Sequence, residues 1–248
     1  MNTSATLQQL RELRLDGMAR SYESVLQLPS HQHPEGHTLI AQLIDAERLN
    51  RLQDRTQLLL KLSRLRFAAS LEELSFTKER NLPKDQIAQL ADCSFISRAE
   101  NILISGATGA GKSFLACAIG HQACVMGYRT LYLNLNRFIE KIMLAKLDGS
   151  FIKLLNQMEK VKLLVLDDFG LAPMDQNTRL ALLQILEDRY AKKSVLIASQ
   201  LPIAKWHEYI AEPTLADAIM DRLFANAHRF ELKGESLRQK STANTTKK

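Results

Sequence analysis

Residues 101–118 read NILISGATGAGKSFLACA, and this stretch decides the fold. An apolar run at residues 102–104 leads into GATGAGKS at residues 106–113, and an apolar helical pattern follows directly. This is the G-x-x-x-x-G-K-[ST] pattern in the context that a phosphate-binding loop requires, between a strand and a helix. The glycines allow successive N–H groups to point at phosphate oxygens, and the helix adds its partial positive charge. The stretch therefore predicts a nucleoside triphosphate site.

The loop pattern gives two of its residues specific roles. Lys112 is expected to reach the β- and γ-phosphates, and Ser113 is expected to ligate Mg²⁺. The residues expected to hold the nucleotide are Gly106, Ala107, Thr108, Gly109, Ala110, Gly111, Lys112, Ser113 and Phe114.

Length and composition indicate an ordinary globular protein. The 248 residues can form one full-sized α/β domain and a smaller one. A formal net charge of +6 makes a polyanionic partner plausible. There is neither an apolar run long enough to span a membrane nor a secretory signal, and the three cysteines form no C-x-x-C pair. We therefore expect a cytoplasmic protein that has no membrane partner and no structural metal.

Two helices are predicted before the loop, over residues 6–28 and 38–66. Between residues 48 and 66 the second helix carries many basic side chains, opposed in that range only by Asp54. A solvated face is the alternative, but the one-signed imbalance favours contact with DNA phosphates. The residues expected to make this contact are Arg48, Arg51 and Arg55.

Strands alternate with helices in the second part of the chain, which predicts a doubly wound parallel α/β sheet. Pro83 interrupts helical continuity before the sheet begins. The expected divisions are a helical N-terminal domain at 1–68, a linker at 69–90, a nucleotide-binding α/β domain at 91–238 and a disordered tail at 239–248.

Two carboxylates follow the apolar run at residues 163–166. Asp167 is placed to hold Mg²⁺, and Asp168 beside it could orient or deprotonate an attacking water. A base next to the metal carboxylate favours hydrolysis over transfer to a small acceptor. The alternative is a strand end with two solvated acids.

Two further polar residues are candidates for the same site. Gln200 ends the next predicted strand, where it could bond the γ-phosphate or the water, or be an ordinary polar strand end. Arg222 lies on a later predicted helix, and could reach the γ-phosphate bound by a neighbouring subunit and offset transition-state charge. The alternative for Arg222 is an ion pair with Asp221 or Glu212 in its own chain.

A basic insertion separates the second and third predicted strands. It consists of two short helices, at 136–147 and 150–159, split by Asp-Gly. Its residues expected to contact DNA are Arg137, Lys141 and Lys146.

Taken together, these motifs resemble the IstB-like family of AAA+ ATPases. Members of this family are the ATP-binding helper proteins of a class of bacterial transposons and are relatives of the DnaC helicase loader and the DnaA initiator. The segments that carry the resemblance are residues 82–120, 163–175, 196–223 and 230–238.

The resemblance implies that ATP and Mg²⁺ bind at the loop. Compared with the motifs of this family, residues 106–113 resemble Walker A and Asp167–Asp168 resemble Walker B. Gln200 falls where sensor I would lie. Arg222 resembles the arginine finger, and Arg238 is a candidate sensor II-like residue that would contact the nucleotide. The basic insertion resembles one that lines a nucleic-acid channel in relatives.

Two features depart from the family pattern. Most AAA+ proteins end Walker B in Asp-Glu, and the shorter Asp168 predicts slow basal turnover. About sixteen residues follow Leu232, so we also expect a truncated C-terminal lid.

The expected function is ATP-dependent regulation of DNA transposition by a Mg²⁺-dependent ATPase. The protein would form a ring or spiral of identical subunits on double-stranded DNA and recruit and stimulate a transposase. The alternative is a DnaC-type replicative helicase loader. A small-molecule kinase is a third hypothesis, disfavoured by the Asp-Asp pair and the short C-terminus.

Overall fold

The computed structural model describes residues 3–234, apart from the side chain of Lys78. The chain divides into two compact units, residues 1–58 and 59–248. No helix among the described residues is both long enough and apolar enough to cross a membrane. The predicted disordered tail, residues 239–248, lies outside the described residues.

The first unit is helical, but the single helix expected over residues 6–28 is wrong. The chain turns at Arg14, whose φ of 57° is left-handed, and a second helix starts at Asp16. The carboxylate of Glu47 explains the break, because it accepts hydrogen bonds from the N–H groups of Gly17 at 2.9 Å and Met18 at 3.3 Å. The elements are α1 (Thr3–Glu12), α2 (Asp16–Leu26), the 3-10 helix η1 (Ser30–Gln32) and α3 (Gly36–Ser63), whose last residues enter the second unit.

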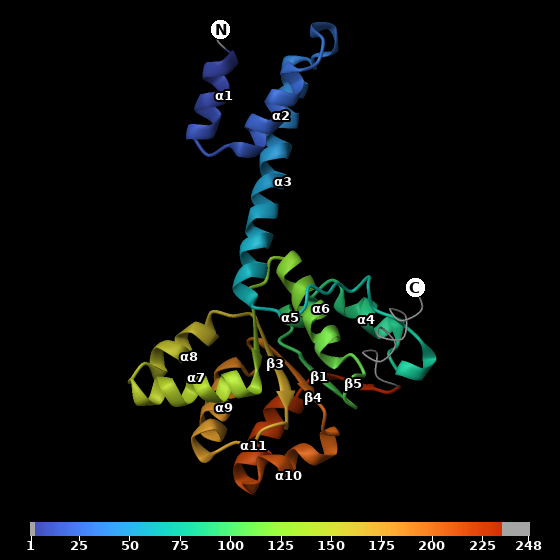
Figure 1. Ribbon diagram of the computed structural model, residues 1–248, viewed down its shortest axis with the longest axis vertical. Helices are drawn as coiled ribbons and strands as arrows, with labels where there is room; N and C mark the ends of the chain where they lie inside the picture. The colour runs from blue at the N-terminus through green and yellow to red at the C-terminus, as the bar shows by residue number, and fades with distance from the viewer. Residues whose placement is uncertain (1–2, 235–248) are drawn as a thin grey trace, which may run out of the picture. The chain divides into compact units, whose positions relative to one another are not determined.

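The second unit holds a five-stranded sheet in the order β2-β3-β4-β1-β5, with every strand pair parallel (Figure 1). The predicted doubly wound α/β sheet is thus confirmed. Because β1 pairs with both β4 and β5, the strand that leads into the loop lies inside the sheet. The strands are β1 (Asn101–Gly106), β2 (Thr130–Asn134), β3 (Leu163–Phe169), β4 (Ser194–Ser199) and β5 (Ala227–Leu232).

Helices cover both faces of this sheet. Side chains alternate along β1, so that Ile102 and Ile104 join one buried cluster and Leu103 joins another. The first cluster includes side chains of α4 (Lys84–Leu90), α5 (Ser94–Ser97) and α6 (Lys112–Val125). The second includes those of α7 (Leu135–Leu147), α8 (Phe151–Glu159), α9 (Gln176–Arg189), α10 (Trp206–Ile210) and α11 (Pro213–Phe224). The short 3-10 helices η2 (Lys78–Arg80) and η3 (Ile203–Lys205) complete the unit.

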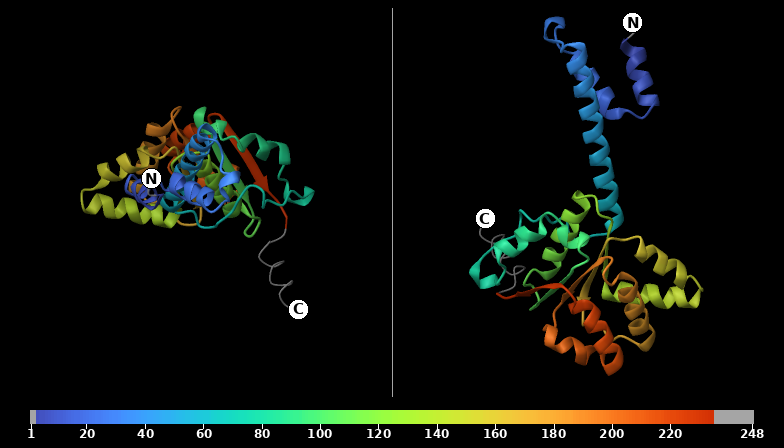
Figure 2. Two further views of the ribbon diagram at one scale, coloured as in Figure 1. Left: turned by 90° about the horizontal axis from the view of Figure 1, so that it is seen from above. Right: turned by 180° about the vertical axis from the view of Figure 1, so that it is seen from behind.

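The α7–α8 pair, which corresponds to the predicted basic insertion, forms a helical hairpin at one side of the sheet (Figure 2). The gap between these helices falls at residues 148–150, and the left-handed φ of Gly149 allows the turn.

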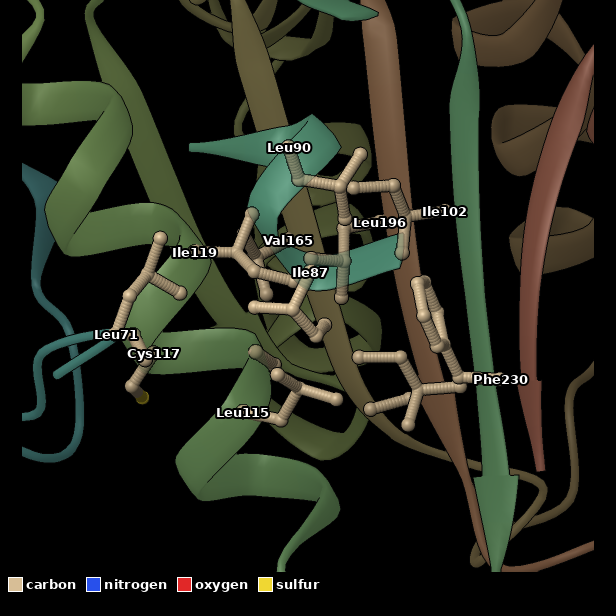
Figure 3. Packing of buried hydrophobic residues seen from close by; sticks show 14 of the residues in the cluster. Leu71, Ile87, Leu90, Ile102, Leu115, Cys117, Ile119, Val165, Leu196 and Phe230 are labelled. Atoms are coloured by element: carbon tan, nitrogen blue, oxygen red, sulfur yellow. The ribbon is translucent and has the colours of Figure 1, made fainter. Parts of the chain in front are cut away.

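Residues 69–90 belong to the second unit and do not form the linker expected from the sequence. Leu71, Ile87 and Leu90 are buried against Ile102 and Val165 of the sheet (Figure 3). This segment thus covers part of one apolar face of the sheet, beside α5 and α6, and keeps that part from water. Pro83 stands at the N-cap of α4, so it starts a helix on the sheet instead of ending one before it.

Candidate functional site

The phosphate loop lies between the end of β1 and the start of α6, as the sequence predicted. Gly106, Gly109 and Gly111 have φ values of 150°, 82° and 92°, which side chains rarely allow. A Cβ on Gly106 would lie 2.4 Å from the carbonyl oxygen of Leu232 on the neighbouring strand. Glycine is therefore required at residue 106 by the close packing of β1 on β5.

Two cations hold the loop through its carbonyl oxygens. Lys112, the first residue of α6, is only 7% exposed, and its Nζ donates to the carbonyl oxygen of Ala107 at 2.8 Å. Arg80, from the segment before α4, donates to the carbonyl oxygen of Ala110 at 2.8 Å. The loop is thereby fixed both by its own lysine and by a residue outside the motif.

Asp167 lies near the C-terminal end of β3 and is 1% exposed. Its Oδ2 accepts a hydrogen bond from the Tyr132 hydroxyl at 2.6 Å, and its Oδ1 accepts one from the backbone N–H of Asp168 at 2.8 Å. Burial, together with the charge of Asp167, raises the pKa of Tyr132 above its usual value. Tyr132 therefore remains a hydrogen-bond donor to this carboxylate throughout the neutral range.

Asp168 has a left-handed φ of 57°, a strained conformation of the kind that gathers at functional sites. Its Oδ2 accepts from Asn134 Nδ2 at 2.6 Å and lies 3.7 Å from Arg66 Nη1. Burial and then the charge of Asp167 raise the pKa of Asp168, against the opposing effects of Arg66, Lys112 and Asn134. A carboxylate with a raised pKa is the better proton acceptor for an attacking water.

Gln200 follows β4 and meets the phosphate loop directly. The Thr108 hydroxyl donates to Gln200 Oε1 at 2.8 Å. Ser199 beside it is buried and donates to the carbonyl oxygen of Phe169, so its hydroxyl is engaged within the sheet. The side chain of Gln200 therefore bonds the loop, whereas the hydroxyl of Ser199 bonds the neighbouring strand.

These residues fit a triphosphate with its cation. Ser113 opens α6 beside Lys112, and the carboxylate of Asp167 lies at the end of a strand of the same sheet. Hydroxyl and carboxylate oxygens are the ligands that Mg²⁺ takes at phosphate sites.

Arg222 lies at the other end of β1 from the loop. Asn101, the first residue of the strand, donates from Nδ2 to the carbonyl oxygens of Arg222 at 2.9 Å and Leu223 at 3.2 Å. The loop follows Gly106, the last of the six strand residues. At about 3.3 Å per residue, the two ends of the strand are roughly 16 Å apart.

The guanidinium of Arg222 is paired within its own chain. Its Nη2 lies 2.7 Å from Glu187 Oε1 on α9, and its Nη1 lies 3.8 Å from Asp221 Oδ2. Glu212, the other partner considered from the sequence, instead accepts from the N–H of Leu215 and caps α11. Glu187 was not foreseen, because it is 35 residues away in sequence and reaches Arg222 only through the packing of α9 on α11.

The basic residues of α3 are less one-sided than their sequence indicated. Arg51 pairs with Glu47 at 2.7 Å, and Arg48 lies 3.8 Å from Asp45. Both carboxylates precede the range in which Asp54 alone was expected to oppose the positive charge. Arg55 also has an interaction partner. The prediction that Arg48, Arg51 and Arg55 contact DNA is untested by this geometry.

Two of the three predicted cations of the insertion come together beside Asp168. Arg137 and Lys141 line a cavity of about 530 Å³ with Arg64 and Arg66, and we call this cavity the basic pocket. Lys146 is elsewhere: its Nζ donates to Asn177 Oδ1 at 2.9 Å and lies over the Phe151 ring. Arg238, the candidate sensor II-like residue, is outside the described residues.

Four residues at this site were missed by the sequence analysis. Tyr132 and Asn134 are in a predicted strand, and their positions near its C-terminal end were a usable signal, since ligands bind at that edge of such sheets. Arg66 and Arg80 carry no local signal, because they reach the site from segments before β1.

A family model described as IstB-like ATP binding protein matches residues 8–245. The chain belongs to this family. An insertion sequence ATP-binding protein of Sinorhizobium fredii is 38% identical over 234 residues, covering 94% of this chain and 96% of the relative. That of IS1162 from Pseudomonas fluorescens is 42% identical over 203 residues, covering 82% of this chain and 88% of the relative. That of IS21 from Pseudomonas aeruginosa is 30% identical over 244 residues, covering 96% and 92%.

Solved structures confirm the fold of this IstB-like protein. AMPPCP-bound DnaA from Aquifex aeolicus has a TM-score of 0.58 and 22% identity, covering 74% of this chain and 56% of that chain. The DnaC helicase loader has a TM-score of 0.52 and 18% identity, covering 67% and 98%. The chain thus belongs to the IstB-like ATP-binding family of insertion sequences and has the same α/β fold as these two replication proteins.

Proposed function

We propose that this IstB-like protein is an ATP-hydrolysing regulator of transposition. In the proposal it assembles on double-stranded DNA as a ring or spiral of identical subunits and recruits and stimulates a transposase. ATP binds at the loop, Gln200 contacts the γ-phosphate or the water, and Asp168 accepts the proton of the attacking water. Ser113 and Asp167 would hold Mg²⁺, which would neutralise charge on the phosphates.

The observation that carries the proposal is the separation of Arg222 from the loop of its own chain. Asn101 ties the backbone of Arg222 to one end of β1, and the loop lies at the other end. An arginine placed in this way cannot act on the nucleotide of its own subunit, but it can reach one bound by a neighbour. This supports a site that two copies of the chain complete together.

Charge and family membership both support this role for the assembly. The formal net charge of +6 and the basic residues of the insertion favour a polyanion such as DNA. The relatives are named as ATP-binding proteins of insertion sequences, which favours a transposase as the partner over a replicative helicase.

A mixing experiment tests the shared site. Asp168→Asn keeps its arginine and its loop but loses the proposed base, whereas Arg222→Ala keeps an intact base. Each variant alone is expected to turn over ATP at least about 10³-fold more slowly than wild type in the presence of DNA. An equal mixture should recover roughly a quarter of the wild-type rate, because some neighbours then combine an intact loop with an intact arginine. A mixture as inactive as its components would contradict the shared site.

A second experiment tests the partner. Strand transfer by the transposase of the same insertion sequence is measured with and without this protein, ATP and target DNA. We expect transfer to require all three. Binding to a replicative helicase, with no effect on strand transfer, would favour the helicase-loader alternative.

A further inference from the structure

The basic pocket brings together two parts of the chain that are far apart in sequence. Arg64 and Arg66 come from the residues that follow α3, and Arg137 and Lys141 come from α7. The cavity between them is about 530 Å³, which is many times the volume of one water molecule. Asp168 lies in its wall.

The charge of this pocket is strongly unbalanced. Four cations surround one carboxylate, and among the described residues Arg64, Arg137 and Lys141 form no salt bridge. Clustered cations repel one another, so an anion that enters the pocket is stabilised by all of them. A phosphate suits this geometry, because arginine side chains bind it through paired N–H groups.

Arg66 is the one cation of the pocket that contacts Asp168, and it does so loosely. The distance from Arg66 Nη1 to Asp168 Oδ2 is 3.7 Å, longer than a direct charge-assisted hydrogen bond. The side chain of Arg66 is 46% exposed, so it can turn toward another anion without creating a void inside the protein.

We propose that the basic pocket binds a backbone phosphate of DNA and that this phosphate draws Arg66 away from Asp168. Released from the cation, Asp168 is free to act on the attacking water, so DNA binding promotes ATP hydrolysis. The inference rests on the proposed function, and adds to it a site and a residue, Arg66, that connect DNA to the ATPase chemistry.

DNA is the favoured source of the phosphate for two reasons. The chain already has a separate loop for the nucleotide triphosphate, with its own lysine, Lys112. Arg64, Arg66 and Arg137 are exposed, so a polymer lying on the surface can present a phosphate to them. The release is expected to be partial, because Asn134 keeps its 2.6 Å hydrogen bond to the same oxygen of Asp168.

The first test separates the pocket from charge in general. The double variant Arg64→Gln/Arg137→Gln is compared with Lys160→Gln, which removes an exposed cation at the end of α8. Binding to a double-stranded oligonucleotide is measured against salt with a non-hydrolysable ATP analogue present. For the double variant we expect about tenfold weaker binding and a salt slope smaller by about 0.9 for each lost phosphate contact. Equal affinities for the double variant, Lys160→Gln and wild type would overturn the proposal.

The second test addresses Arg66. In Arg66→Gln, ATP turnover without DNA should rise several-fold, and the additional stimulation by DNA should fall toward one. Arg66→Lys retains a cation and should retain most of the stimulation, and thermal unfolding of both variants shows whether they fold. If Arg66→Gln folds but keeps wild-type basal turnover and full stimulation by DNA, Arg66 does not couple DNA binding to ATP hydrolysis.

The outcomes distinguish this inference from the proposed function. If wild-type turnover does not respond to DNA, the proposed function itself fails. If wild type responds and the pocket variants respond equally, only the inference fails. Inorganic phosphate at millimolar concentration is the control for the source of the phosphate that the basic pocket binds. If it stimulated turnover as strongly as DNA does, the assignment to the DNA backbone would be overturned.

Discussion

The hydroxyl of Tyr132 donates a 2.6 Å hydrogen bond to Oδ2 of Asp167, the carboxylate proposed to hold Mg²⁺. The two residues lie on the neighbouring strands β2 and β3, so the bond fixes the direction of the carboxylate across the sheet. Hydrogen bonds of this kind orient metal ligands, and their loss commonly weakens metal binding by about tenfold or more.

Tyr132→Phe is therefore expected to raise the Mg²⁺ concentration for half-maximal ATP turnover by about tenfold. The aromatic ring is retained, so the sheet should keep its stability. The measurement is a Mg²⁺ titration of turnover at saturating ATP. Tyr128→Phe is the matched control, because the Tyr128 hydroxyl meets Ser97 and not a carboxylate. An unchanged titration for Tyr132→Phe would show that this hydrogen bond does not orient the metal site.

The contact between Thr108 and Gln200 separates two possible roles of Gln200. If Gln200 contacts the γ-phosphate or the water, Gln200→Ala should slow turnover on the order of 10²-fold with little change in ATP affinity. Thr108→Val removes only the donor to Gln200 and should change turnover by no more than about threefold. Similar losses in both variants would instead mean that Gln200 acts by holding the loop.

Gly106→Ala is expected to destabilise the second unit severely. Its Cβ would meet the Leu232 carbonyl oxygen at 2.4 Å, and neither strand can move without breaking the sheet. We expect a loss of more than about 3 kcal/mol of unfolding free energy and no measurable ATP binding. Gly149→Ala is the matched control: its φ is also positive, at 73°, but a Cβ there meets nothing within 4 Å. That variant should lose only about 1–2 kcal/mol in chemical denaturation.

Glu100 predicts a pH dependence of stability. Arg98 bonds its carboxylate at 2.6 Å and His228 at 2.8 Å, and against the effect of burial they lower the pKa of Glu100 to about 2. Because this pKa is lower in the folded state, the stabilisation is complete above about pH 4.5 and is lost as the pH falls from there toward 2. Glu100→Gln should cost about 1–2 kcal/mol of unfolding free energy at pH 7, and progressively less below pH 4.5.

Urea denaturation between pH 3 and pH 7 measures this difference. The control is Glu208→Gln, whose carboxylate pairs with Lys205 but is 75% exposed, so its loss should not change stability measurably. A constant difference between Glu100→Gln and wild type across this range would contradict the assigned linkage.

The parts of the site that were predictable from sequence are those in which neighbouring residues act together. The loop at residues 106–113 and the pair Asp167–Asp168 are short segments whose chemistry depends on local order, and the sheet follows from the alternation of strands and helices. Tyr132 meets Asp167 only because β2 lies beside β3, and strand order is set by the packing of the whole sheet.

The remaining differences have the same physical origin. The pairing of Arg222 with Glu187 depends on two helices that pack side by side after folding. Residues 69–90 have too few regularly spaced apolar residues to predict their burial, yet their scattered apolar side chains help to cover one face of the sheet. The break after Glu12 is stabilised by Glu47, which is distant in sequence.

Asn101 joins the start of β1 to the backbone of Arg222, and the phosphate loop follows the other end of the same strand. If each nucleotide is shared between the loop of one copy and the arginine of the next, every contact between copies is heterologous, joining two unlike surfaces. Such an assembly has a direction whenever it does not close on itself. One terminal copy then presents a loop without an arginine, and the other an arginine without a loop. A protein that binds the assembly could therefore distinguish its two ends, and so the orientation in which it lies on DNA.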